Sequence, residues 1–98
     1  MKLLIPVDEQ NYSDAKIASI DNKIGWLCVE IDGGNVKGDR FFKDRAESKD
    51  LMDFVILKDK SENFEEFLDD GIDVLLAPFQ KSVEDIVEAY NFRELHEI

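Results

Sequence analysis

Several carboxylates fall where strands are expected to end or pair. Asp8 follows the first apolar run, Glu30 and Asp32 belong to the second, and Asp59 follows the fourth. Carboxylates clustered at one sheet edge can hold two Mg²⁺ ions about 4 Å apart and cleave phosphodiesters. Asp8, Glu9 and Asp59 could instead hold a single Mg²⁺ or Ca²⁺ ion without catalysis. No spacing requires either site, and Asp8 follows its strand rather than lying within it, so both stay open as alternatives.

The soft metal ligands of the chain are one cysteine and one histidine. Cys28 lies inside "WLCVEI", which predicts a buried strand thiol, and His96 lies near an end that is expected to fray. Iron clusters are held by thiolates or imidazoles, so this pair cannot build a multi-ligand Cys/His cage. Cys28 also has no basic partner nearby in sequence. We therefore expect no enzyme, and a single cysteine, which cannot form a disulfide within the chain, agrees with a reducing, cytoplasmic compartment.

The charge of the chain is strongly negative and unevenly distributed. The net charge is −11, and residues 61–98 carry 11 acidic but 2 basic side chains, against 12 acidic and 10 basic side chains in residues 1–60. An acidic surface repels nucleic acid, because binding to phosphate requires Lys and Arg. The sequence also contains no apolar run long enough to cross a membrane. We expect a single soluble domain over residues 1–98 that binds neither nucleic acid nor membrane.

The pattern of apolar residues predicts five strands. The first covers Lys2 to Val7, and the second and third lie in "IGWLCVEID" and "NVKGDRFFKD" on either side of Gly33-Gly34, a pair typical of hairpin turns. The runs "FVILK" and "DVLLAP" show no polar alternation, as expected of strands covered on both faces. The first and fourth strands are expected to be neighbours.

Helices are predicted to follow the last two strands. Ser61 is placed to cap the first, with Phe64, Phe67 and Leu68 on its buried face and Gly71 at its end. Ser82 and Asp85 begin the second in a capping-box-like arrangement. A short helix of about two turns is predicted in "RAESKDLMD". The resulting fold class is α/β: a mixed five-stranded sheet with an antiparallel β-hairpin and flanking helices.

The loop between the fourth strand and its helix, "KDKSEN", contains no glycine. Loops that bind phosphate or a metal cluster at such a position use glycines, because a bare backbone lets the N–H groups approach the ligand. The sequence therefore provides the scaffold of a ligand site without the usual backbone cradle.

Four segments together resemble a known family: "MKLLIPVD", "GWLCVEIDGGNV", the pair "FVILK…GIDVLLA" and "SVEDIVEAY". Over essentially the whole chain they are similar to the dinitrogenase iron–molybdenum cofactor biosynthesis family, the small NifX- and NafY-like accessory domains. The resemblance implies a ribonuclease-H-like fold and a non-enzymatic role. Its members with known roles bind or carry the iron–molybdenum cofactor or its iron–sulfur precursors.

Two family motifs differ in this chain. Ser19-Ile20-Asp21-Asn22 stands where the family has a His-Phe-Gly-Arg-like segment, and Lys58 to Asn63 replaces a glycine-rich loop. Position in the family pattern places the cofactor-binding residues in the loops Ser13 to Lys23 and Lys58 to Asn63. The positions that the resemblance indicates are Ser19, Asp21, Asn22, Lys58 and Lys60. The two lysines could pair with an anionic cluster or with its carboxylate-bearing ligand.

The alternative is a protein-interaction or regulatory module without a metal cofactor. The segment "KGDRFFKDRAESK" gathers basic side chains around two aromatic rings; the residues are Lys37, Arg40, Phe41, Phe42, Lys43, Arg45 and Lys49. In a strand the two rings point to opposite faces, so one of them could be an exposed interface anchor, or both could be buried. The same edge strand could support a homodimer unless its charges prevent it.

Overall fold

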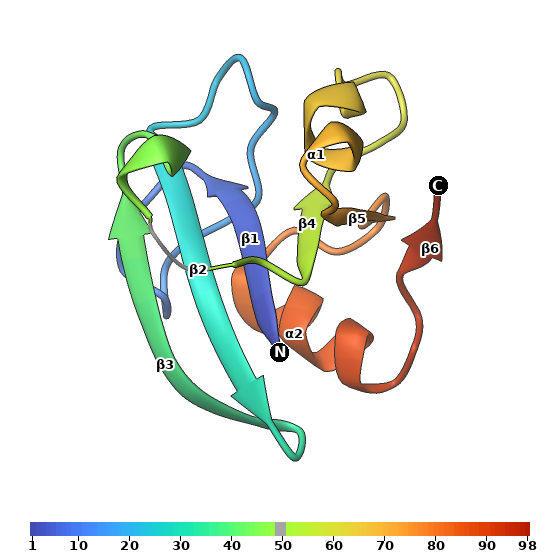
Figure 1. The fold of residues 1–98 in the computed structure, drawn as a ribbon. Helices are drawn as coiled ribbons and strands as arrows, with labels where there is room; N and C mark the ends of the chain where they lie inside the picture. The colour runs from blue at the N-terminus through green and yellow to red at the C-terminus, as the bar shows by residue number, and fades with distance from the viewer. Residues whose placement is uncertain (49–50) are drawn as a thin grey trace.

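The computed structural model describes residues 1–48 and 51–98, and one mixed sheet organises them (Figure 1). Its strands are β1 (Lys2–Val7), β2 (Gly25–Asp32), β3 (Asn35–Phe42), β4 (Phe54–Leu57), β5 (Asp73–Leu76) and β6 (His96–Glu97), in the order β3-β2-β1-β4-β5-β6. The pairs β1–β4 and β4–β5 are parallel, and the other pairs are antiparallel. The helices are the 3₁₀ turn η1 (Arg45–Glu47), α1 (Glu65–Asp69) and α2 (Val83–Asn91).

The hairpin β2–β3 forms one edge of the sheet. Gly33 and Gly34 turn it with φ angles of 59° and 83°, a conformation that side chains other than glycine rarely adopt. Glu30 pairs with Gly38 whereas Ile31 pairs with Val36, so Lys37 is an extra residue that makes a bulge in β3. Residues 35–40 of this edge strand are exposed.

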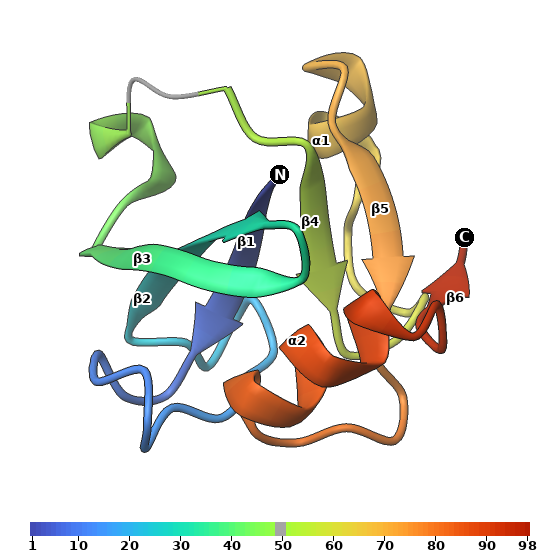
Figure 2. The ribbon, with the colours of Figure 1, turned by 90° about the horizontal axis from the view of Figure 1, so that it is seen from below.

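The helix α2 covers one face of the sheet (Figure 2). Its residues Val83, Ile86 and Val87 pack in one core with inward-facing residues of β1 and β2. The Ser82 hydroxyl caps the helix by accepting the N–H of Asp85 at 3.0 Å, as predicted. Burial of these apolar side chains, together with the cap, holds α2 firmly on the sheet.

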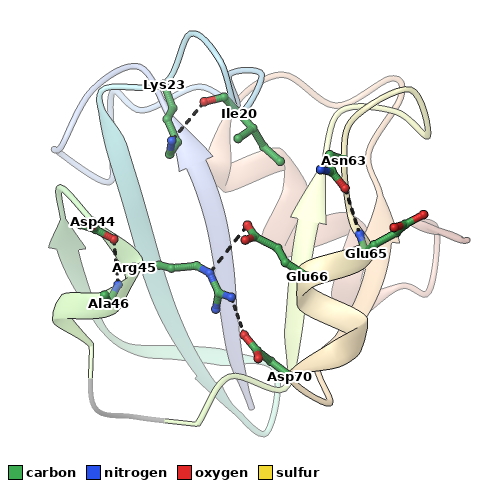
Figure 3. A network of polar contacts seen from close by, with 9 residues as sticks. All are labelled: Ile20, Lys23, Asp44, Arg45, Ala46, Asn63, Glu65, Glu66 and Asp70. Carbon is green, nitrogen blue, oxygen red and sulfur yellow. Dashed lines mark hydrogen bonds and ion pairs between the residues drawn. The ribbon is translucent and has the colours of Figure 1, made fainter.

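The opposite face is covered by a smaller element, α1. Phe67 is fully buried there against Leu4, Val55 and Leu57, and its ring meets Trp26 edge to face at 5.7 Å. Arg45 reaches across from η1, stacks over the Phe67 ring at 4.7 Å and forms an ion pair with Asp70 at 2.5 Å (Figure 3). A hollow of about 560 Å³ remains beside Arg45, so this face is less completely covered than the α2 face.

The structure corrects three sequence predictions. The sheet has six strands rather than five, because His96 and Glu97 pair with β5 instead of fraying. The predicted two-turn helix after β3 is the single turn η1, and Lys49 lies outside the described residues. Leu68, expected to be buried, keeps 45% of its surface exposed, because α1 turns one residue, Phe67, into the core.

Several other fold predictions agree with the structure. The bounds of β1 are those predicted, and β1 and β4 are neighbours. The helix α1 ends before Gly71, and the Ile72 N–H bonds back to the Phe67 carbonyl at 2.8 Å. Over the residues described, the longest helices are too short and too polar to cross a bilayer.

Candidate binding site at the carboxyl ends of β1 and β4

The carboxyl ends of β1 and β4 mark the point where the chain direction across the sheet reverses. From β1 the chain continues to β2 on one side, and from β4 it continues through α1 to β5 on the other. In open α/β sheets, ligands bind in the crevice outside such a switch point. Pro6 lies here and has no N–H to donate to β4, and the paired residues of β1 and β4 end at Leu4 and Val55.

The loop after β1 is drawn over this point by backbone hydrogen bonds. The Asp8 N–H bonds to the Lys16 carbonyl at 3.1 Å, and the Ile17 N–H reaches the carbonyl of Lys81 at 2.8 Å. The next residue, Ala18, donates its N–H to the Pro6 carbonyl at 2.8 Å. These contacts place Ser19 to Asn22 beside the loop that follows β4.

The two loops are joined by the carboxylate of Glu62. The Ile20 N–H donates to one carboxylate oxygen at 2.5 Å, and the Lys58 N–H donates to the other at 3.1 Å. The Lys23 ammonium donates to the Ile20 carbonyl at 3.1 Å (Figure 3) and also lies 5.2 Å from the centre of the Trp26 ring. The backbone N–H and the carbonyl of Ile20 are therefore both bonded to charged side chains.

A hollow of about 350 Å³ opens beside this junction. Its lining residues come from both loops: Ser19, Ile20, Asp21, Ser61, Glu62 and Asn63. The hydroxyl oxygen of Ser19 is buried and has no hydrogen-bond partner among the described residues. A buried polar atom of this kind favours a ligand or water that would bond to it.

The predicted site residues divide into two groups. Ser19 and Asp21 line the hollow, and the two loops lie side by side as the family pattern required. Asn22 is exposed and bonds through its N–H to the Ser19 carbonyl at 3.1 Å, outside the lining. The side chains of Lys58 and Lys60 are exposed and also lie outside the lining. Lys58 contributes to the junction through its backbone N–H alone.

Ser61 has a different role from the one predicted. Its hydroxyl and its N–H both donate to one oxygen of Asp59, which places them in a tight turn before α1. The helix α1 begins after Phe64, and among its described residues no side chain caps it. The hydrogen bond from the Ser61 hydroxyl, then that from its N–H, lowers the pKa of Asp59 below its usual range.

Sequence reasoning missed Glu62 and Lys23 as site residues. Glu62 lies in the loop Lys58 to Asn63, which the family pattern indicates, but nothing nearby in the sequence gives its carboxylate a role in a site. Its real acceptor role joins it to Ile20, 42 residues away. No local sequence pattern indicates a partner at that distance. The absence of glycine from this loop indicated only that its backbone does not form the usual cradle for a ligand.

With Glu62 in this position, the lining does not suit an anionic iron cluster. Asp21 and Glu62 bring negative charge, and the N–H groups of Ile20 and Lys58 are already occupied by Glu62. The cysteine lies elsewhere, buried in β2 with its sulfur 3.6 Å from the Met52 sulfur. His96 lies in β6, where its ring meets Phe79 edge to face.

The carboxylate sites considered from the sequence do not assemble. Glu30 pairs with Lys2, at the opposite end of β1 from Asp8. Asp8 accepts the N–H of Lys16 at 2.9 Å and so serves its own loop. Within residues 1–48 and 51–98, no group of three or more His, Cys, Asp or Glu side chains is arranged to hold a metal ion.

The aromatic anchor considered for β3 is also not formed. Phe42 is buried, with 7% of its surface exposed, and Phe41 is half-buried against the α2-side core. The Phe41 ring lies directly over Gly25, where a Cβ atom would come within 2.4 Å of it. Both rings therefore belong to the packing of the sheet.

Comparisons with known proteins identify the fold. No family model and no curated protein matches the sequence. The crystal structure of a "putative dinitrogenase" from Methanocaldococcus jannaschii superposes with a TM-score of 0.74 at 23% identity, covering 100% of this chain and 94% of that one. A "putative NifB protein" from Thermotoga superposes with a TM-score of 0.68 at 16% identity, covering 98% and 91%. These likenesses confirm, at the level of the fold, the resemblance to nitrogenase cofactor accessory domains.

Proposed function

We propose that this protein is a non-enzymatic binding protein of the nitrogenase cofactor accessory type, and that it binds at the hollow between the loops after β1 and β4. One observation carries the proposal: two loops distant in sequence are joined at the switch point of the sheet, beside a hollow of about 350 Å³. That crevice is where α/β sheets bind ligands.

The chemistry of the lining favours a cationic ligand rich in hydrogen-bond donors. Asp21 offers a carboxylate, Asn63 an amide, and Ser19 a buried hydroxyl oxygen without a partner in the described structure. An Arg or Lys side chain of a partner protein has the matching charge and donors. The net charge of −11 would speed the approach of such a basic partner and disfavour nucleic acid.

The test is a titration with a fluorescent hexa-arginine peptide at low and moderate salt. We expect Asp21→Asn to weaken binding about 2- to 5-fold, as expected for loss of one partly exposed ion pair. Asp69→Asn is the matched control, because it removes the same charge from an exposed position on α1. Equal weakening by the two variants would mean that the peptide senses net charge and not the hollow.

Carriage of a metal cluster is the second candidate function, and the names of the fold neighbours favour it. In that case an iron–molybdenum cofactor or an iron–sulfur precursor would be the cargo, held by Lys58 and Lys60 rather than by a Cys/His cage. Anaerobic titration with a reconstituted iron–sulfur cluster, followed by desalting and iron quantification, separates the candidates. We expect a colourless protein; stoichiometric iron that is lost on Lys58→Ala with Lys60→Ala would establish carriage instead.

The proposal also covers the fold class, the location in the cell and the oligomeric state of the protein. A hairpin followed by strand–helix–strand crossovers supports the ribonuclease-H-like class. A cytoplasmic location and a single domain over residues 1–98 are proposed with it. A homodimer through β3 is disfavoured by its bulge and by the exposed charge of Lys37, which hinder pairing of strand edges.

A further inference from the structure

The contact between Glu62 and the two loops has the form of a bound anion. Each carboxylate oxygen accepts one backbone N–H, from Ile20 at 2.5 Å and from Lys58 at 3.1 Å. The two donors belong to different loops, so the carboxylate is what they share. Hydrogen bonds from backbone N–H groups to a carboxylate are stronger than those between neutral groups.

The carboxylate reaches this position from a short turn and not from a rigid helix. Glu62 lies between the Asp59–Ser61 turn and α1, which begins at Glu65. Its side chain is half-buried and lies at the wall of the hollow. The donors would make the same two hydrogen bonds with the carboxylate of any small acid that reached them through the hollow.

We propose that the N–H groups of Ile20 and Lys58 form a binding site for a small carboxylate or similar oxyanion, and that Glu62 fills this site from within the chain. An external carboxylate competes with Glu62 for the two donors. When the external carboxylate binds to the two N–H groups, Glu62 is released into the hollow, and the ligand then joins the loops after β1 and β4. The site uses the loops of the proposed function but does not depend on a basic partner.

Chemical rescue of Glu62→Ala by formate tests the site. Removal of the carboxylate leaves the partly buried N–H of Ile20 and the exposed N–H of Lys58 without their acceptor, so the variant should melt at a lower temperature than the wild type. Formate should bind the variant saturably and raise its Tm by about 5 °C, because a ligand that binds the native state stabilises it. Formamide at the same concentration, neutral and of similar size, should have little effect.

Two measurements make the test specific. Glu65→Ala removes an exposed glutamate three residues away, and formate should shift its Tm no more than that of the wild type. In the ¹H–¹⁵N spectrum of Glu62→Ala, formate should move the amide resonances of Ile20 and Lys58 along one saturation curve. Equal Tm shifts in the two variants, or no movement of these two amides, would overturn the proposal.

A second variant covers the case in which Glu62→Ala does not fold. Glu62→Gln keeps the volume of the side chain but offers one acceptor oxygen to two donors. Formate should displace its carboxamide and shift the same two amide resonances, and an unchanged spectrum would contradict the proposal. The peptide titration of the hollow uses Asp21 and the wild-type Glu62, so either idea can fail while the other stands.

Discussion

Two strand–loop–helix units lie side by side in this protein, and they look alike in sequence but differ in structure. In the β5–α2 unit, Ser82 caps a nine-residue helix that buries four side chains. In the β4–α1 unit, Ser61 bonds to Asp59, and the five-residue helix buries Phe67. Each unit has a serine shortly before a helix with acids in its first turn.

The difference reflects what each loop does with its polar groups. The loop before α2 uses them to begin a helix, which makes the unit a support for the sheet. The loop before α1 uses them across the molecule, where Glu62 holds the N–H of Ile20 from the loop after β1. The helix α1 is thus short and lacks a side-chain cap, because the loop before it directs its polar groups to the loop after β1.

Among the changes considered, removal of the Phe67 ring from the β4–α1 unit should have the largest effect on stability. Phe67→Ala should lower the free energy of unfolding by about 3–5 kcal/mol, because the ring is fully buried and is the side chain that anchors α1. Ile86→Ala in α2 should cost about 2–5 kcal/mol. Urea denaturation measures both values.

Amide hydrogen exchange then separates the two variants. Phe67→Ala should speed exchange in residues 58–70 more than elsewhere, since α1 has little other attachment, whereas Ile86→Ala should speed it throughout the sheet. The same exchange pattern in both would mean that the units are equally integrated in the core.

Substitution of the two serines, Ser82 and Ser61, should have smaller effects on stability, and these effects should differ between the two units. Ser82→Ala should lower the free energy of unfolding by about 1 kcal/mol, the usual cost of losing a helix cap. Ser61→Ala should change it by less than about 0.5 kcal/mol, because its hydroxyl bonds within an exposed turn. Thermal melts of the two variants test this order, and a reversed order would mean that Ser61 supports α1 by a route other than capping.

The smallest effect concerns the titration of Asp59. Its pKa is lowered in the folded protein by the Ser61 hydrogen bonds, so the associated stability is present above the unfolded pKa and is lost as pH falls through the folded pKa. Ser61→Ala should raise the pKa of Asp59 toward the ordinary aspartate value. A ¹³C titration of the Asp59 carboxyl carbon in the wild type and in Ser61→Ala measures this pKa. An unchanged midpoint would mean that the hydroxyl does not bond to Asp59 in solution.

Local patterns predicted those parts of the fold that local forces decide. The Gly33-Gly34 hairpin, the end of α1 at Gly71 and the Ser82 cap each depend on residues within a few positions. The neighbouring loops at Ser19 and Asp21 followed from the expected strand order.

The features that could not be predicted depend on the choice between competing partners, most of them in distant segments. The sixth strand depends on His96 pairing with Leu76, and the Ser61 cap failed because Asp59 competes for the hydroxyl. The acceptor role of Glu62 depends on a partner 42 residues away. Apolar periodicity carries no information on which polar group accepts from which backbone, so the scaffold was more predictable than the site.

The bulge at Lys37 also affects how the protein behaves at high concentration. An exposed, regular edge strand of eight residues is a template on which other chains can add, and repeated addition produces fibrils. The extra residue interrupts the even spacing of hydrogen-bonding groups along β3, and any incoming strand would have to bury the ammonium of Lys37. A single inserted lysine thus gives the longest open edge of this small sheet a built-in resistance to aggregation.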